Sequence, residues 1–125
     1  MAQLHDAARN GDLDIVNALI AAGADVNVAN MYGSTAMHWA ARNNHIAIVN
    51  ALIAAGADVN AASNDGWTAM QEAARYGHTD IVNALITAGA DVNAASNDGW
   101  TAMQWAASES HHDIVKSLIA AGADE

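Results

Sequence analysis

The side chains best suited to metal binding or proton transfer are six histidines, in a chain that has no cysteine. Five of them fall into two series with a spacing of 33 residues, His5 and His38 in one and His45, His78 and His111 in the other. A repeated spacing indicates framework positions in a repeated structure. His111 and His112 are adjacent, but two neighbouring imidazoles without a third ligand nearby make a weak zinc site. The sequence therefore predicts no metal site and no other cofactor.

Nucleophilic catalysis requires a hydroxyl beside a base, and the segment Ser108-Glu109-Ser110-His111 offers this combination. Its spacing is local and typical of a loop. A hydrolase triad needs an oriented base and an oxyanion site inside a pocket, whereas a stack of small residues forms no deep cavity. We therefore predict that the chain is not an enzyme.

The charge of the chain disfavours two further classes of partner. Four Lys or Arg residues against fourteen Asp or Glu residues give a formal net charge of −10, which repels phosphate backbones and anionic lipids. The first residues, Met1-Ala2-Gln3-Leu4, carry no export signal, and no apolar run approaches the roughly 18 residues that a membrane span needs. We expect a soluble protein that binds neither nucleic acid nor membrane and has no targeting signal.

The elements that position these residues repeat along the chain. Ile-Val-Asn-Ala-Leu-Ile occurs at 15–20, 48–53 and 81–86, and Ile-Val-Lys-Ser-Leu-Ile follows at 114–119. The segments 56–71 and 89–104 are identical over all sixteen residues, which indicates an engineered sequence because natural repeats diverge. The repeat predicts a single domain, 1–125, made of an N-terminal capping repeat at 1–29, internal repeats at 30–62 and 63–95, and a C-terminal capping repeat at 96–125.

Each full unit is predicted to contain a turn and two helices. In the third unit the turn lies at 64–66, where Asp-Gly favours a tight turn. A first helix is expected from Thr68 to about Tyr76 and a second from about Thr79 to Ala88, with Gly89 ending it. The apolar residues of the second helix follow the spacing of one buried stripe, so neighbouring units must stack to cover it.

Capping residues support these boundaries. Thr68 with Gln71, and Thr101 with Gln104, have the spacing of capping boxes. The link between the two helices falls on four equivalent positions that we expect to be left-handed, namely Gly11, Asn44, Gly77 and Ser110. Serine lacks the tolerance of Gly and Asn for this conformation, so mild strain is predicted at Ser110.

The period of 33 residues, the turn glycines and the Thr-x-x-His, Gly-His, Ile-Val and Gly-Ala-Asp-Val-Asn-Ala motifs together resemble the ankyrin-repeat family over essentially the whole chain. The resemblance implies an all-α solenoid of helix-turn-helix units with β-turn, hairpin-like loops at right angles to the helices, L-shaped repeats and a concave groove. The arrangement of a cap, two internal repeats and a cap resembles consensus-designed ankyrin binders. The family motif Thr-Pro-Leu-His is replaced at 35–38 by Thr-Ala-Met-His, and the whole chain lacks proline, which favours a separately built or computationally designed scaffold.

By the same resemblance, turns and first helices form the concave recognition surface, and the framework histidines bridge backbone groups between repeats. The aromatic residues all lie in turns or first helices, and Trp, Tyr, Met and Arg are enriched at interface centres. Asp6, Trp39, Glu72 and Trp105 are expected to form one row, and Arg9, Arg42, Arg75 and Ser108 another. The predicted protein-binding residues are Met31, Tyr32, Ser34, Trp39, Arg42, Asn43, Asp65, Trp67, Glu72, Arg75, Tyr76, Asp98, Trp100 and Trp105.

The leading hypothesis is an engineered module that binds a folded protein, such as the other half of a designed pair. Its support is asymmetry, because Trp39 and Trp105 interrupt a row that otherwise carries Asp6 and Glu72. The alternative is a consensus scaffold or folding model without a target, in which the Trp residues are optical probes or repeat filler. For the aromatic residues themselves, the alternative to a protein interface is partial burial between turn and helix. A natural regulatory domain is disfavoured by the sixteen-residue identity. We expect a synthetic monomer, made in the cytoplasm of an expression host, with weak self-association through exposed aromatic residues.

Overall fold

Helices occur in pairs along the computed structural model, which describes residues 3–123. The predictions that concern Met1 and Ala2 at one end, and Asp124 and Glu125 at the other, lie outside the described residues. Between residues 3 and 123 the helices are α1 (Gln3–Asn10), α2 (Leu13–Ala21), α3 (Ala36–Arg42), α4 (Ile46–Ala54), α5 (Ala69–Tyr76), α6 (Thr79–Thr87), α7 (Ala102–Ser108) and α8 (His112–Ala120). The protein is an all-α repeat solenoid, as the sequence predicted.

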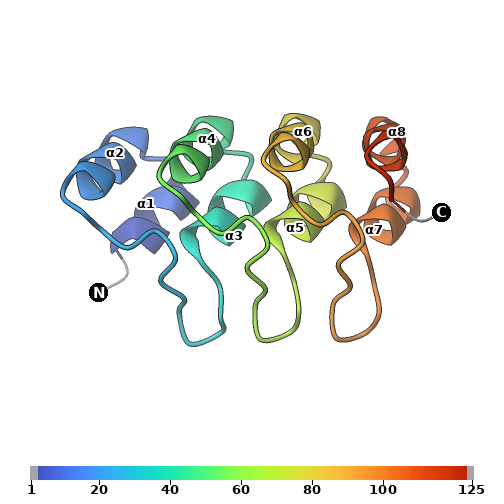
Figure 1. The fold of residues 1–125 in the computed structure, drawn as a ribbon, viewed down its shortest axis with the longest axis horizontal. Helices are drawn as coiled ribbons and strands as arrows, with labels where there is room; N and C mark the ends of the chain where they lie inside the picture. The colour runs from blue at the N-terminus through green and yellow to red at the C-terminus, as the bar shows by residue number, and fades with distance from the viewer. Residues whose placement is uncertain (1–2, 124–125) are drawn as a thin grey trace.

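The helices form two rows that run the length of the molecule (Figure 1). The first helices of the pairs, α1, α3, α5 and α7, make one row, and α2, α4, α6 and α8 make the other. Each helix packs against its own partner and against the equivalent helix of the next pair. Long loops before α3, α5 and α7 extend to one side, beyond the row of first helices. This arrangement places equivalent positions of successive repeats side by side.

Side-chain caps explain where the first helices begin. The Thr68 N–H donates to Gln71 Oε1 at 3.1 Å, and the Gln71 N–H donates to Thr68 Oγ1 at 3.4 Å. Thr101 and Gln104 form the same pair of hydrogen bonds before α7. Both predicted capping boxes are confirmed. The predicted bounds of α5 and α6 are one residue too wide at Thr68 and Ala88, because these two residues are caps.

The link between paired helices is left-handed in all four pairs between residues 3 and 123. The φ angle is 80° at Gly11, 64° at Asn44, 79° at Gly77 and 61° at Ser110. A residue with a Cβ atom is disfavoured by roughly 1–2 kcal/mol in this region, although Asn tolerates it better than most. The predicted conformation is confirmed, and Ser110 carries the strain that the sequence indicated.

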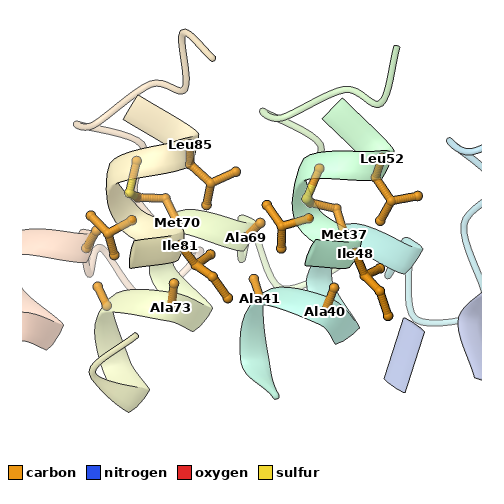
Figure 2. Close-up of a cluster of buried hydrophobic side chains, with 14 of the residues drawn as sticks. Met37, Ala40, Ala41, Ile48, Leu52, Ala69, Met70, Ala73, Ile81 and Leu85 are labelled. Carbon is orange, nitrogen blue, oxygen red and sulfur yellow. The ribbon is translucent and has the colours of Figure 1, made fainter. Parts of the chain in front are cut away.

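Alanines of the first helices and longer aliphatic residues of the second helices make the core (Figure 2). Met37, Ile48 and Leu52 pack as one group, and Met70, Ile81 and Leu85 pack in the same way one repeat later. The alanines between them are fully buried and allow neighbouring helices to approach closely. Met37, Met70 and Met103, which recur at one repeat position, therefore fill the core.

Five histidine side chains hydrogen-bond to backbone carbonyl oxygens, and four of these oxygens belong to a neighbouring repeat. The Nε2–H groups of His45, His78 and His111 donate to the carbonyl oxygens of Arg9, Arg42 and Arg75, at 3.1, 2.9 and 3.1 Å respectively. His38 Nε2–H donates to the Trp67 carbonyl oxygen at 2.8 Å, and His5 Nε2–H donates to the Val28 carbonyl oxygen, also at 2.8 Å. The framework role that the resemblance implied for these histidines is confirmed.

The turns also contact one another through hydrogen bonds. The backbone N–H of Asn64 donates to the Tyr32 carbonyl oxygen at 2.9 Å, and that of Asn97 donates to the Asp65 carbonyl oxygen at 2.8 Å. The Asn97 side chain adds a bond to the Asn64 carbonyl oxygen at 2.9 Å. The three turns are thus held in register.

Among the described helices, none is long and apolar enough to cross a membrane.

Candidate functional site

The predicted binding residues all lie in the turns at 30–34, 63–67 and 96–100 or on the first helices and their caps. We call the surface made by these turns and by α1, α3, α5 and α7 the first-helix face. Nothing on the second helices contributes to the predicted set. The hydrogen bonds between turns and the packing between first helices therefore fix how the set is displayed.

A hollow of about 240 Å³ lies on the first-helix face between the second and third repeats. Its lining combines aromatic, hydroxyl and charged side chains from two turns and two helices, namely Tyr32, Ser34, Arg42, Ser63, Asp65, Trp67, Glu72, Arg75 and Tyr76. Eight of these nine residues belong to the predicted set. The ninth, Ser63, accepts a hydrogen bond from the Trp67 backbone N–H at 3.2 Å and so shapes the turn. Ser63 was not predicted, and its place directly before the predicted turn at 64–66 is the signal by which sequence could have found it.

Three tryptophans stack next to this hollow. Trp105 on α7 lies between Trp67 and Trp100, with ring centroids 5.1 and 4.6 Å apart and both ring pairs tilted by 38°. Aromatic pairs at these distances contribute about 0.5–1.5 kcal/mol each beyond the area that they bury. All three rings are half-buried, and the indole Nε1 of Trp105 is buried without a hydrogen-bond partner among the described residues. Trp67 belongs to both the hollow and this tryptophan cluster.

Arginines at one repeat position stack on aromatic rings. The Arg75 guanidinium lies 4.8 Å from the ring centre of Trp105, 5.3 Å from that of Tyr76 and 5.6 Å from that of Trp67. Arg42 lies 5.6 Å from the Tyr76 ring. These are cation–π distances, which orient the guanidinium groups at the edge of the hollow. The stacking links the hollow to the tryptophan cluster.

Arg9 continues this arginine row towards the N-terminal end. Its guanidinium lies 5.8 Å from the Trp39 ring and bonds Asp6 at 3.2 Å. Arg9 belongs to the predicted arginine row, although it is not one of the predicted binding residues. Trp39 is half-buried, packs against the core and does not line the hollow. The structure therefore separates the Arg9–Trp39 pair from the tryptophan cluster.

Glu72 is a half-buried carboxylate in the lining of the hollow. Burial raises the pKa of Glu72 above its usual value, and the positive charges of Arg42 and Arg75 oppose this rise. Asp65 is an exposed carboxylate in the same lining. The hollow thus combines two arginines with two carboxylates of different exposure.

The remaining predicted residues lie around this centre. Met31 at the first turn tip is 82 % exposed, and Tyr32 beside it is 66 % exposed although it lines the hollow. Asn43 caps α3 by donating to the Trp39 carbonyl oxygen. Asp98 accepts hydrogen bonds within its own turn, from Ser96 Oγ–H and from the Trp100 N–H. Asn43 and Asp98 therefore stabilise local structure.

Across residues 3–123 no group of three or more His, Asp or Glu side chains is arranged to hold a metal ion. In the segment considered for catalysis, the Nε2–H of His111 donates to the Arg75 carbonyl oxygen, so this nitrogen serves the framework. The arrangement is suited to contact with a large ligand through the hollow and the tryptophan cluster.

Comparison with known families identifies the repeats of this chain. A family model of ankyrin repeats, in three copies, matches residues 4–96, and a single ankyrin repeat matches residues 98–125. No curated protein matches the sequence. The two family matches together span nearly all of the described residues.

Proposed function

Because this chain belongs to the ankyrin-repeat family, we propose that it is a module that binds a folded protein through the first-helix face. Ankyrin repeats generally mediate protein–protein interaction and are typically not enzymes. The finer proposal concerns the surface and its residues. The binding centre comprises the hollow and the tryptophan cluster, and the exposed turn tips surround it.

The observation that carries this proposal is the composition of the hollow. It gathers Tyr32, Trp67 and Tyr76 with two arginines, at a single place where the packing of repeats makes a depression. Tyr, Trp and Arg are the residues that most often dominate binding energy at interfaces, because they bury a large area and retain polar contacts.

Preorganisation supports the same proposal. The turns are connected by backbone and asparagine hydrogen bonds, and the rings of the site stack on one another and on arginine. Side chains that are already ordered lose less conformational entropy when a partner binds. A rigid face of this kind is suited to a folded partner. It is less suited to a partner whose binding would require the face to change conformation.

We also propose that the sequence is engineered, with a single domain divided at 29/30, 62/63 and 95/96 into capping and internal repeats. The identity of the sixteen residues 56–71 and 89–104 supports an engineered origin. Exposed Met31 and Tyr32 support weak self-association of a protein that is otherwise monomeric.

A target-free scaffold is the second candidate, and one observation favours it. Trp67 and Trp100 occupy equivalent positions inside the identical segments, so repetition of a consensus unit accounts for both of them. Trp39 and Trp105 have the opposite pattern, since Asp6 and Glu72 stand at the equivalent positions of the other repeats. This asymmetry is why the binding module is proposed first.

An array of purified folded proteins, probed with the fluorescently labelled chain, distinguishes the two candidates. The test variant is Trp67→Ala with Arg75→Ala, which removes the centre of the first-helix face. The matched control is Asn50→Ala with Asn83→Ala, two exposed positions on α4 and α6. Binding that the control keeps and the test variant loses supports the module. Binding that both variants keep contradicts it, and the absence of any bound protein favours the scaffold.

A further inference from the structure

Arg42 and Arg75 differ from Arg9 in what their charges contact. Arg9 is paired with Asp6 at 3.2 Å, whereas neither Arg42 nor Arg75 makes an ion pair or a side-chain hydrogen bond with another residue between 3 and 123. Both side chains are exposed. Each guanidinium nonetheless has a defined position, because it stacks on aromatic rings. Two oriented cations with unused hydrogen-bond donors therefore lie at the edge of the hollow.

The stacked arginines favour a negatively charged group on the partner over a positively charged one. Arg75 already stacks over Trp67, Trp105 and Tyr76, and Arg42 stacks over Tyr76 as well. A cation from a partner would be repelled by these two arginines. A carboxylate instead meets the N–H groups in the guanidinium plane, which stacking leaves free and which match a carboxylate in bidentate geometry.

The repeat sets the distance between the two sites. Arg42 and Arg75 hold equivalent positions on α3 and α5, which pack side by side, and packed helices lie roughly 8–10 Å apart. On a partner helix, residues seven positions apart lie on one face at a separation of about 10 Å. The two spacings agree to within the reach of an arginine side chain.

We infer that Arg42 and Arg75 form a pair of carboxylate sites for a partner helix that carries Asp or Glu at positions i and i+7. This inference rests on the proposed function, because it takes the first-helix face as the binding surface, and it adds the chemistry of the partner. Glu72 lines the same hollow and interacts electrostatically with both arginines, so it competes with the incoming carboxylates. The net charge of −10 repels a strongly acidic protein at long range, so the acidic pair stands on a partner that is otherwise neutral or basic.

The arginine side chains themselves report on this proposal. Nitrogen-15 labelled protein gives three arginine Nε–Hε signals, because the chain contains only Arg9, Arg42 and Arg75. Arg42→Lys and Arg75→Lys assign the signals, since each removes one of them. The probe is a capped, alanine-rich helical peptide of about 15 residues with Glu at i and i+7. Matched peptides carry Gln or Lys at the same two positions.

The Glu peptide is expected to shift the Arg42 and Arg75 signals together, while the Arg9 signal changes little because Asp6 already occupies that guanidinium. Arg42→Gln or Arg75→Gln should weaken binding about tenfold or more, and Glu72→Gln should strengthen it roughly two- to fivefold. The inference is overturned if no signal shifts, if all three arginines shift alike, if the Lys peptide binds as well as the Glu peptide, or if Glu72→Gln weakens binding.

The array experiment and the peptide titration together distinguish failure of the acidic-helix inference from failure of the proposed function. Array partners that need Trp67 and Arg75, together with a Glu peptide that moves no arginine signal, would leave the binding module standing and remove the acidic helix. An array without partners and a Glu peptide that binds as described would support the acidic helix as the ligand class of this face.

Discussion

Replacing Gly66 by alanine is expected to destabilise the protein by about 1–3 kcal/mol more than replacing Gly99 in the same way. The two glycines occupy the same turn position within identical sequence segments, with φ angles of 83° and 84°. Both substitutions place a Cβ atom in the left-handed region, at a cost of roughly 1–2 kcal/mol, and both recover about 0.4–1 kcal/mol by restricting the unfolded chain. These contributions cancel in the comparison.

The difference comes from the next turn. A Cβ atom on Gly66 would lie 2.8 Å from Asn97 Oδ1, 2.9 Å from the Asn97 backbone nitrogen and 3.0 Å from Ser96 Cα, whereas nothing lies within 4 Å of one on Gly99. Displacing Asn97 weakens its two hydrogen bonds to Asp65 and Asn64. A typical hydrogen bond contributes about 0.5–1.5 kcal/mol, so the loss of both gives the predicted difference.

Equilibrium urea unfolding, followed by far-UV circular dichroism, measures this difference. Tryptophan fluorescence is a poor readout here because Trp67 and Trp100 lie beside the substituted glycines. Equal destabilisation of Gly66→Ala and Gly99→Ala would refute the reasoning, since it would mean that the turns do not pack against one another. The turns would then not hold the candidate binding residues in register.

Three further predictions follow from single residues. Ser110→Gly should stabilise the protein by about 0.5–1 kcal/mol in urea unfolding, because φ of 61° is relieved at a modest entropic cost, and an unchanged midpoint would argue against strain there. Leu85→Ala should cost about 2–5 kcal/mol because the side chain is fully buried, whereas exposed Ile119→Ala should cost less than about 1 kcal/mol. Burial lowers the pKa of His38 below its usual 6.5, so the folded state binds fewer protons than the unfolded state, and stability should fall as the pH drops through about 6.5. The raised pKa of Glu72 has the opposite effect on stability, which should rise as the pH drops towards 4.5. His38→Gln should reduce the loss of stability between pH 7 and 5.5. An unchanged pH profile of stability would contradict the lowered pKa of His38.

The framework was predictable because its signals repeat. The left-handed conformation at Ser110 follows from glycine at the equivalent positions of two other repeats, and the capping of α5 follows from the spacing of Thr68 and Gln71. A third cap, before α3, was not predicted from the sequence. In this cap the Thr35 N–H donates to His38 Nδ1 at 3.0 Å. An imidazole is not the expected partner in a capping box, which normally uses Glu or Gln.

The details of the candidate site were less accessible to sequence. Repeat phase indicates that Trp105 and Arg75 belong to one face, but it does not give the rotamers that bring Arg75 to 4.8 Å from the Trp105 ring. The separation of Trp39 from the hollow likewise depends on its packing against the core. Contacts between side chains of neighbouring repeats depend on helix spacing and rotamer choice, which periodicity leaves open.

Hydrogen–deuterium exchange with and without a partner captured on the array tests the central claim most directly. Binding through the first-helix face predicts slower exchange in the turns at 63–67 and 96–100 and in α5 and α7, with α4 and α6 unchanged. Protection confined to α4 and α6, with the turns unaffected, would contradict the claim and move the binding surface to the second helices.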